Sequence, residues 1–304
     1  MIRRRILLVL PTLLGVAVLV FSFIHLVPGD PVDMMLGEAA EPADATALRH
    51  ALGLDRPLGA QLLTFLGRVA RGDLGESVAF REPVAALVAA RLPATLELAA
   101  AALLIALAIA LPLGIVAAMR RGSPLDRFVR IASLAGVCVP TIWLGPLLVL
   151  AFSLHLGWLP TSGRGGVEHL VLPALTLGLG MAGVLVRLTR TSVLDALAED
   201  STRTARAKGA PPWRVVGVHA FRTALGPIVT VTGLQLGALL AGAVVTETIF
   251  AWPGLGRLVV QAIGARDYPL VQGCALVFGT TYVLVNACTD VLLAALDPRL
   301  RDAD

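Results

Sequence analysis

Residues 98–119 read LAAAALLIALAIALPLGIVAAM, a stretch of apolar and small residues without a single charge. A helix needs about 20 such residues to cross the ~30 Å hydrocarbon core of a bilayer. Five further stretches are similarly apolar, at residues 6–27, 131–156, 170–186, 224–245 and 270–289. The sequence therefore predicts an all-α integral membrane protein with about six transmembrane helices.

The overall composition supports this prediction. Hydrophobic residues make up 57% of the 304 positions and charged residues only 15%, whereas soluble globular chains are about 45–50% apolar and about 25% charged. Three arginines precede the first apolar stretch, as in a secretory signal peptide. That stretch is longer than the apolar region of a signal peptide, and no small-residue cleavage site follows it, so we expect an uncleaved first span.

Lys and Arg are distributed unevenly between the loops. If successive loops alternate between the two sides, one side holds the N-terminus, the loops 120–130 and 187–223, and the C-terminal tail. With Asp290 of the last span left out, that side carries 16 of the 25 basic residues and 7 of the 21 acidic ones, and the other side carries 9 and 13. Loops rich in Lys and Arg remain in the cytoplasm, so we expect both termini to be cytoplasmic.

The segment between the first two spans, residues 28–93, is too polar to cross a membrane. A surface helix is predicted where apolar side chains recur at helical spacing, at Leu58, Leu62, Leu66 and Val69. Gly72-Asp73-Leu74-Gly75 is typical of a turn after this helix. A second short helix is predicted from Pro83, because proline suits the first helical position. These helices either cap the protein or contact an external partner.

The loop 187–223 predicts two short helices joined by a turn. Asp200 or Ser201 can cap the first helix, Gly209 suits the left-handed position after its end, and Pro211 and Pro212 prevent its continuation. The second helix is expected from Pro212 onward.

The first loop helix is small and basic. Arg203, Arg206 and Lys208 can make charge-assisted contacts, and Ala205 and Ala207 would let the surface of another protein approach closely. We interpret this helix as a docking site, with contact to anionic lipid as the alternative. A DNA-binding helix-turn-helix also matches the pattern, but these helices adjoin two spans, so we expect no nucleic-acid partner.

The sequence carries no evident motif for catalysis or for a bound cofactor. Residues 178–183 match GxGxxG, but they lie within a span and are better explained by close helix packing. The chain has no GxxxxGK[ST] motif, so any ATP must be bound by another chain. The cysteines lie in apolar stretches without a CxxC motif, which argues against a metal site. Acidic residues are missing from the middle of the spans, which argues against a proton-coupled secondary transporter.

Residues 199–209, EDSTRTARAKG, resemble the EAA-loop signature of bacterial ABC-type import permeases. Aligned on Gly209, the Glu-Ala-Ala of that signature falls at Arg203, Thr204 and Ala205. Arginine in place of the glutamate is typical of the peptide/nickel branch, the B-type subunits of dipeptide and oligopeptide permeases. Further matches to that branch lie at residues 28–31, 52–55, 72–75, 246–256, 266–269 and 297–299.

The resemblance implies a type I ABC importer permease fold in a bacterial cell membrane, with a first helix and outer segment (1–93), a core (94–297) and a tail (298–304). It implies a non-catalytic subunit that works with a second homologous permease, two cytoplasmic ATPases that use ATP and Mg, and an extracytoplasmic solute-binding protein. The short outer loop 157–169 leaves peptide, nickel and glutathione open as substrates. The residues implied in ATPase docking are Asp200, Ser201, Arg203, Thr204, Ala205, Arg206, Ala207, Lys208 and Gly209.

Overall fold

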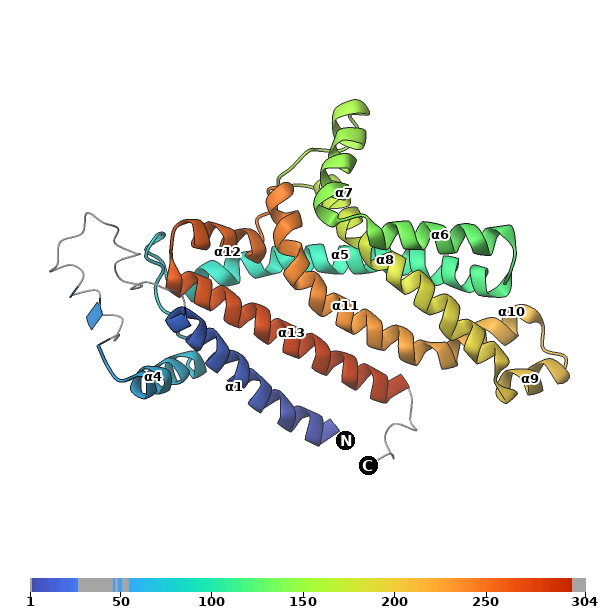
Figure 1. Ribbon diagram of the computed structural model, residues 1–304, viewed down its shortest axis with the longest axis horizontal. Coiled ribbons are helices and arrows are strands. Elements are labelled where there is room, and N and C mark those ends of the chain that lie inside the picture. Colours follow the sequence, from blue (N-terminus) through green and yellow to red (C-terminus); the bar gives the residue numbers. More distant parts are fainter. Residues whose placement is uncertain (1, 27–45, 47–48, 51–54, 297–304) are drawn as a thin grey trace.

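A computed structural model of the chain describes residues 2–26, 46, 49–50 and 55–296 (Figure 1). Within these residues the protein is built from helices, and its only β pairing is an isolated bridge between Glu76 and Pro83. The expected motifs at residues 28–31, 52–54 and 297–299 and the predicted tail lie outside the described residues.

The predicted spans coincide with helices. Among the described residues four helical stretches are long and apolar enough to cross a membrane. They are α5 (Val84–Met119), α8 (Val167–Ala198), α13 (Tyr268–Leu296) and Pro212–Leu239, which runs from α10 (Pro212–Arg214) through η2 (Val215–Ala220) into α11 (Phe221–Ile249). The bent pair formed by α6 (Pro124–Cys138) with α7 (Thr141–Leu148) and η1 (Val149–His155) is a fifth candidate. The first stretch forms α1 (Ile2–Leu26). The predicted all-α membrane fold is confirmed.

The third predicted span is not straight. α6 and the α7–η1 segment meet at an angle of 101°. In Figure 1 this segment starts beside α8 and α11, where α7 packs, and its far part stands clear of the other helices. The break lies at Val139 and Pro140, both in extended conformation. Proline disfavours the helical conformation of the residue before it and offers no backbone N–H to continue the helix. The stretch predicted as the third span, 131–156, therefore forms two helical segments with a bend at Pro140, and their crossing of the membrane as one span stays a prediction.

The short outer helix predicted from Pro83 is also wrong as a separate element. Pro83 caps α5, which then runs without interruption for 36 residues and includes the second predicted span. Pro93 lies inside this helix and does not end it. The division of the chain at residues 93 and 94 falls within α5 and stays a prediction.

α5 and α8 pack closely along their length through small side chains. Ala102, Ala106 and Ala110 of α5 are fully buried and, at a spacing of four, lie along one helix face. A Cβ at Gly178 of α8 would lie 2.9 Å from the carbonyl oxygen of Ala102. The GxGxxG match therefore serves helix packing, as predicted.

α11 joins this pair to α13. Added Cβ atoms at Gly233 and Gly237 of α11 would lie 2.2 Å from Thr289 and 2.6 Å from Tyr282 of α13. These two glycines, spaced as GxxxG, permit the close approach of the two helices. α1 packs on the far side of α13 (Figure 1).

The elements divide between two ends of the molecule. The start of α1, the end of α13, the corner between α5 and α6, and α9 (Asp200–Ala207) lie toward one end in Figure 1, and α4 (Leu58–Ala70) and α12 (Leu255–Gly264) lie toward the other. We call these the inner end and the outer end. α4 has the predicted bounds, and the turn after it contains Gly72 at φ 77° and Gly75 at φ 88°.

Candidate functional site at the inner end

The predicted loop 187–223 is shorter than expected, because helices extend into it from both sides. α8 continues to Ala198, so the exposed connection begins at Glu199. After α9, α10 (Pro212–Arg214) and η2 (Val215–Ala220) lead directly into α11. The second loop helix predicted from Pro212 is therefore wrong as a separate element. The residues predicted to form it instead form the first turns of the continuous helix that leads into α11.

α9 is fastened to its own chain by one narrow face. The backbone breaks at Glu199, which is extended, and the hydroxyl of Thr202 donates a hydrogen bond of 2.8 Å to the carbonyl oxygen of Ala196 in the last turn of α8. Thr202 and Ala205, three positions apart, are both buried and face α8 and η2. The remaining faces of α9 are left uncovered.

The start of α9 differs from the prediction by one residue. Asp200 is the first helical residue, and the N-cap is Glu199, whose side chain does not cap the backbone. Ser201 instead donates its hydroxyl to the Glu199 carboxylate at 3.4 Å.

The end of α9 agrees with the prediction. Gly209 has φ 81°, its N–H donates to the Arg206 carbonyl oxygen at 2.9 Å, and the N–H of Ala210 donates to the Ala205 carbonyl oxygen at 3.2 Å. These two bonds form a Schellman motif, which requires a left-handed residue at the position of Gly209.

The exposed face of α9 is mainly cationic. Arg203 is 73% exposed and approaches Asp200, itself 97% exposed, at 3.7 Å. An exposed pair of this kind stabilises little, so Arg203 remains available to a partner. The other predicted docking residues that lie exposed are Ser201, Thr204, Arg206, Ala207, Lys208 and Gly209.

Ala205 has a different role from the predicted one. Its side chain is buried on the face of α9 that packs against the rest of the chain, so it cannot let another protein approach and instead attaches the helix to its own chain. Thr202, which sequence reasoning missed, does the same. The signal was its spacing of three from Ala205, which places both residues on one helical face.

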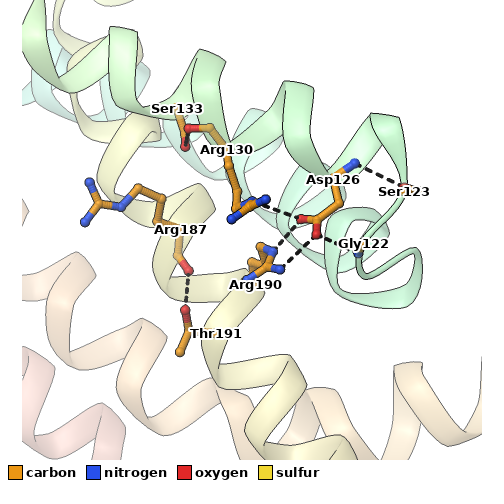
Figure 2. A network of polar contacts seen from close by, with 8 residues as sticks. All are labelled: Gly122, Ser123, Asp126, Arg130, Ser133, Arg187, Arg190 and Thr191. Carbon is orange, nitrogen blue, oxygen red and sulfur yellow. Dashed lines mark hydrogen bonds and ion pairs between the residues drawn. The ribbon is translucent and has the colours of Figure 1, made fainter.

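A buried ion pair lies beside the site, at the corner between α5 and α6 (Figure 2). Arg190 of α8 binds both carboxylate oxygens of Asp126, at 2.6 and 2.9 Å. Asp126 is 1% exposed and also accepts the backbone N–H of Gly122 at 2.9 Å. This pair was not predicted from the sequence. The pattern Ser123-x-x-Asp126, similar to a capping box, could have indicated that Asp126 lies at the start of a helix, and the Ser123 hydroxyl does accept the Asp126 N–H.

A second buried carboxylate lies at the outer end. Glu247, near the end of α11, is fully buried. It accepts the Thr95 hydroxyl at 2.7 Å and the Arg257 backbone N–H at 3.0 Å. It thereby neutralises the N-terminus of α12, where partial positive charge gathers. The indole N–H of Trp252 donates to the Ala94 carbonyl oxygen at 2.8 Å beside it.

Asp267 has the same role one helix later. It accepts the backbone N–H of Leu270 at 3.1 Å in the first turn of α13 and the hydroxyl of Ser77 in the turn after α4. Both outer carboxylates therefore hold helix termini. Among the described residues no group of His, Cys, Asp and Glu is arranged to hold a metal ion.

Polar side chains within the apolar helices bond to backbone carbonyl oxygens, Gln235 across to α8 and the other two within their own helical segment. Gln235 donates to the Met181 carbonyl oxygen at 3.2 Å, Asn286 donates to that of Tyr282 at 3.1 Å, and His155 contacts that of Leu150 at 2.8 Å. Bonds of this kind satisfy the side chains within the protein. Cys274 is buried, whereas Cys138 and Cys288 are exposed on this chain.

Long apolar helices packed through small residues, with an exposed basic helix at one end, are the architecture of a multi-pass membrane protein. A chain of the inward-facing MetNI methionine ABC transporter matches with a TM-score of 0.57 and 19% identity, over 69% of this chain and 96% of that one. An amino acid ABC transporter solved with histidines gives a TM-score of 0.52 and 16% identity, over 70% and 94%.

The chain belongs to the family of binding-protein-dependent transport system inner membrane components, whose model matches residues 110–302. The model of the N-terminal part of these membrane components matches residues 1–99. The resemblance found in the sequence, to the peptide branch of ABC import permeases, is confirmed.

Curated relatives match nearly the whole chain. The di/tripeptide transport system permease protein DppB of Pseudomonas aeruginosa is 45% identical over 99% of this chain and 98% of its own length. The dipeptide transport system permease protein DppB of Escherichia coli K12 is 42% identical over the same shares. The glutathione transport system permease protein GsiC of Salmonella typhimurium is 44% identical over 98% and 97%.

Proposed function

We propose that this chain is a non-catalytic, membrane-spanning subunit of an ATP-driven importer of dipeptides or oligopeptides. It works with a second, homologous permease, an extracytoplasmic solute-binding protein and two cytoplasmic ATPases that bind ATP and Mg. Support for the substrate comes from the two DppB relatives, which are named for dipeptide or di/tripeptide transport and align over 98% of their length.

The observation that carries the proposal is the construction of α9. A short helix with two buried side chains, Thr202 and Ala205, and an otherwise exposed surface has the form of a docking element. Its cations, Arg203, Arg206 and Lys208, suit an acidic groove on a soluble partner, since bonds between ionised groups are the stronger kind. In this proposal the ATPase binds α9 and moves it on binding ATP.

The proposal also assigns the two ends to the two sides of the membrane. The inner end holds α9, the α5–α6 corner, the start of α1 and the end of α13, and the segments predicted for this side carry 16 of the 25 basic residues. The positive-inside rule assigns that end to the cytoplasm. The outer end, with α4 and α12, then faces the solute-binding protein.

Glutathione import is a second candidate for the substrate. The alignment to the Pseudomonas DppB runs over 329 residues, more than the 304 of this chain, so that relative has residues that this chain lacks. The alignment to GsiC runs over 298 residues, so it does not require GsiC to have residues that this chain lacks. The difference in length favours a glutathione permease as the alternative.

Reconstituted uptake tests the function. The chain is incorporated into liposomes with its permease, ATPase and binding-protein partners, and uptake of labelled dialanine, a pentapeptide and glutathione is compared. Peptide uptake is expected only with ATP on the ATPase side and with the binding protein present. Preference for glutathione would select the second candidate. Uptake driven by a pH gradient without ATPase would refute the proposal.

A further inference from the structure

The buried pair of Asp126 and Arg190 joins two elements that are 64 positions apart in the sequence. Asp126 lies in the first turn of α6 and Arg190 near the end of α8. The planar guanidinium binds both oxygens of the carboxylate, which fixes orientation as well as distance. The Gly122 N–H also donates to Asp126. Two hydrogen bonds from Arg190 thereby hold the corner between α5 and α6 to α8, and the third, from Gly122, fixes the carboxylate within the corner.

The contact is protected from water on both partners. The Asp126 side chain is 1% exposed and that of Arg190 is 17% exposed. Arg130, in contrast, is 53% exposed and approaches the same carboxylate only at 3.8 Å. A buried pair is screened little by water, and removal of one partner leaves the other charge buried without compensation. The pair is therefore a specific link rather than a surface contact.

The same helices are in contact a little farther along. A Cβ at Gly183 of α8 would lie 2.7 Å from the carbonyl oxygen of Ser133 and 2.9 Å from the Val137 side chain, both in α6. On its other flank α8 meets α5, where a Cβ at Gly114 would lie 2.6 Å from the Thr189 side chain. Contact this close leaves little room for α6 to slide along α8. The ion pair adds a directional bond at the inner end of this contact.

Arg190 is also close to α9 along the chain. The helix α8 continues unbroken from Arg190 to Ala198, about 12 Å along its axis. Its last turn accepts the Thr202 hydroxyl of α9. A displacement of α9 thus acts first on the end of α8 that holds Asp126. The other end of α6 is the 101° bend into α7.

We propose that the Asp126–Arg190 pair transmits movement, so that a displacement of α9 carries the bent pair α6–α7 with α8. This rests on the proposed function, because it takes α9 to be the element that the ATPase moves. Asp126 and Arg190 are then positioning residues for coupling. Without their bond, α8 follows α9 but α6 lags, and ATP is hydrolysed with less substrate moved.

The test compares the number of peptides imported per ATP hydrolysed in liposomes holding the complete importer. Asp126→Asn removes the charge at nearly constant shape, and Arg190→Lys keeps the charge but loses the two-pronged geometry. For Asp126→Asn the ratio is expected to fall about fivefold, within the range for residues along coupling networks. Arg190→Lys gives a smaller fall. Arg187→Gln is the matched control, an exposed arginine one turn earlier that points away from Asp126 in Figure 2.

A role in stability alone would lower the amount of assembled importer and leave the ratio unchanged, and that result would overturn the proposal. Hydrogen exchange gives an independent readout on the complex. In Arg190→Lys, amides at the start of α6 are expected to exchange faster than in the wild type, and unchanged exchange there would also overturn it. If the wild-type complex showed no ATP-driven uptake, the proposed function would fail. The exchange measurement would still test whether the Asp126–Arg190 pair holds the start of α6 to α8.

Discussion

The two ends of this molecule use buried carboxylates in different ways. At the outer end, Glu247 and Asp267 accept backbone N–H groups at the starts of α12 and α13, so each holds a turn in place. They also accept the hydroxyls of Thr95 and Ser77. At the inner end, Asp126 accepts the backbone N–H of Gly122, but it also binds a charged side chain, Arg190 of another long helix. Beside it, α9 is attached by two buried side chains and is otherwise exposed. The outer end is held by contacts within the chain, whereas the exposed faces of α9 at the inner end are available to a partner.

This difference teaches how one chain combines rigidity with movement. Bonds to backbone groups fix a corner, because neither helix can shift without leaving a buried polar group unsatisfied. The ion pair between Asp126 and Arg190 instead joins two long helices through their charged side chains, and on this account they move together as a unit. On this account the outer end keeps its shape while the inner end responds to the ATPase.

The largest expected effect on stability comes from Glu247 at the outer end. Glu247→Ala leaves the Thr95 hydroxyl and the Arg257 N–H buried without an acceptor, and we expect a loss of about 3 kcal/mol. Thermal denaturation of the purified chain in detergent measures it. Glu97→Ala is the control, since that carboxylate is 41% exposed in its pair with Arg164 and should cost less than about 1 kcal/mol. Equal losses for the two variants would show that the Glu247 bonds do not stabilise the corner.

A smaller effect is expected from Thr202 at the inner end. Thr202→Val keeps the volume but loses the hydrogen bond to Ala196, at a cost of about 1 kcal/mol. The loss should be local, so we expect faster protease cleavage between residues 199 and 211 with little change in global denaturation. Ser201→Ala, next to it and exposed, should leave cleavage unchanged. If Thr202→Val lowered global stability as much as Glu247→Ala, the inner end would be as tightly fixed as the outer one.

The sequence predicts the helices well because a membrane imposes a simple rule on apolar length. All six predicted stretches coincide with helices or with the bent pair. The errors in the predicted helix bounds come at prolines, because a proline ends a helix at some positions and is accommodated within it at others. Pro140 breaks a span, whereas Pro93 lies within α5 and does not end it. Whether the neighbouring helices compensate for the lost hydrogen bond decides between the two cases, and that depends on packing.

The candidate site was predictable only in part. The end of α9 at the left-handed Gly209 follows from local capping rules, whereas the start of α9 has no side-chain cap and was predicted one residue too late. Which side of α9 is buried does not, so Ala205 was assigned to a partner although its own chain covers it. The pairing of Asp126 with Arg190 joins distant positions, and no local pattern states which residue a buried carboxylate will meet. The orientation and the docking role stay predictions.

The central claim is that α9 is where an ATPase docks, and co-purification with the ATPase tests it most directly. Arg206→Glu combined with Gly209→Pro reverses a charge and removes the φ 81° turn that ends the helix. Arg127→Glu, an exposed arginine at the same end, is the control. In the double variant we expect recovery of ATPase with the tagged chain to fall about tenfold, and the control should match the wild type. Undiminished recovery of the ATPase with the double variant would contradict the account.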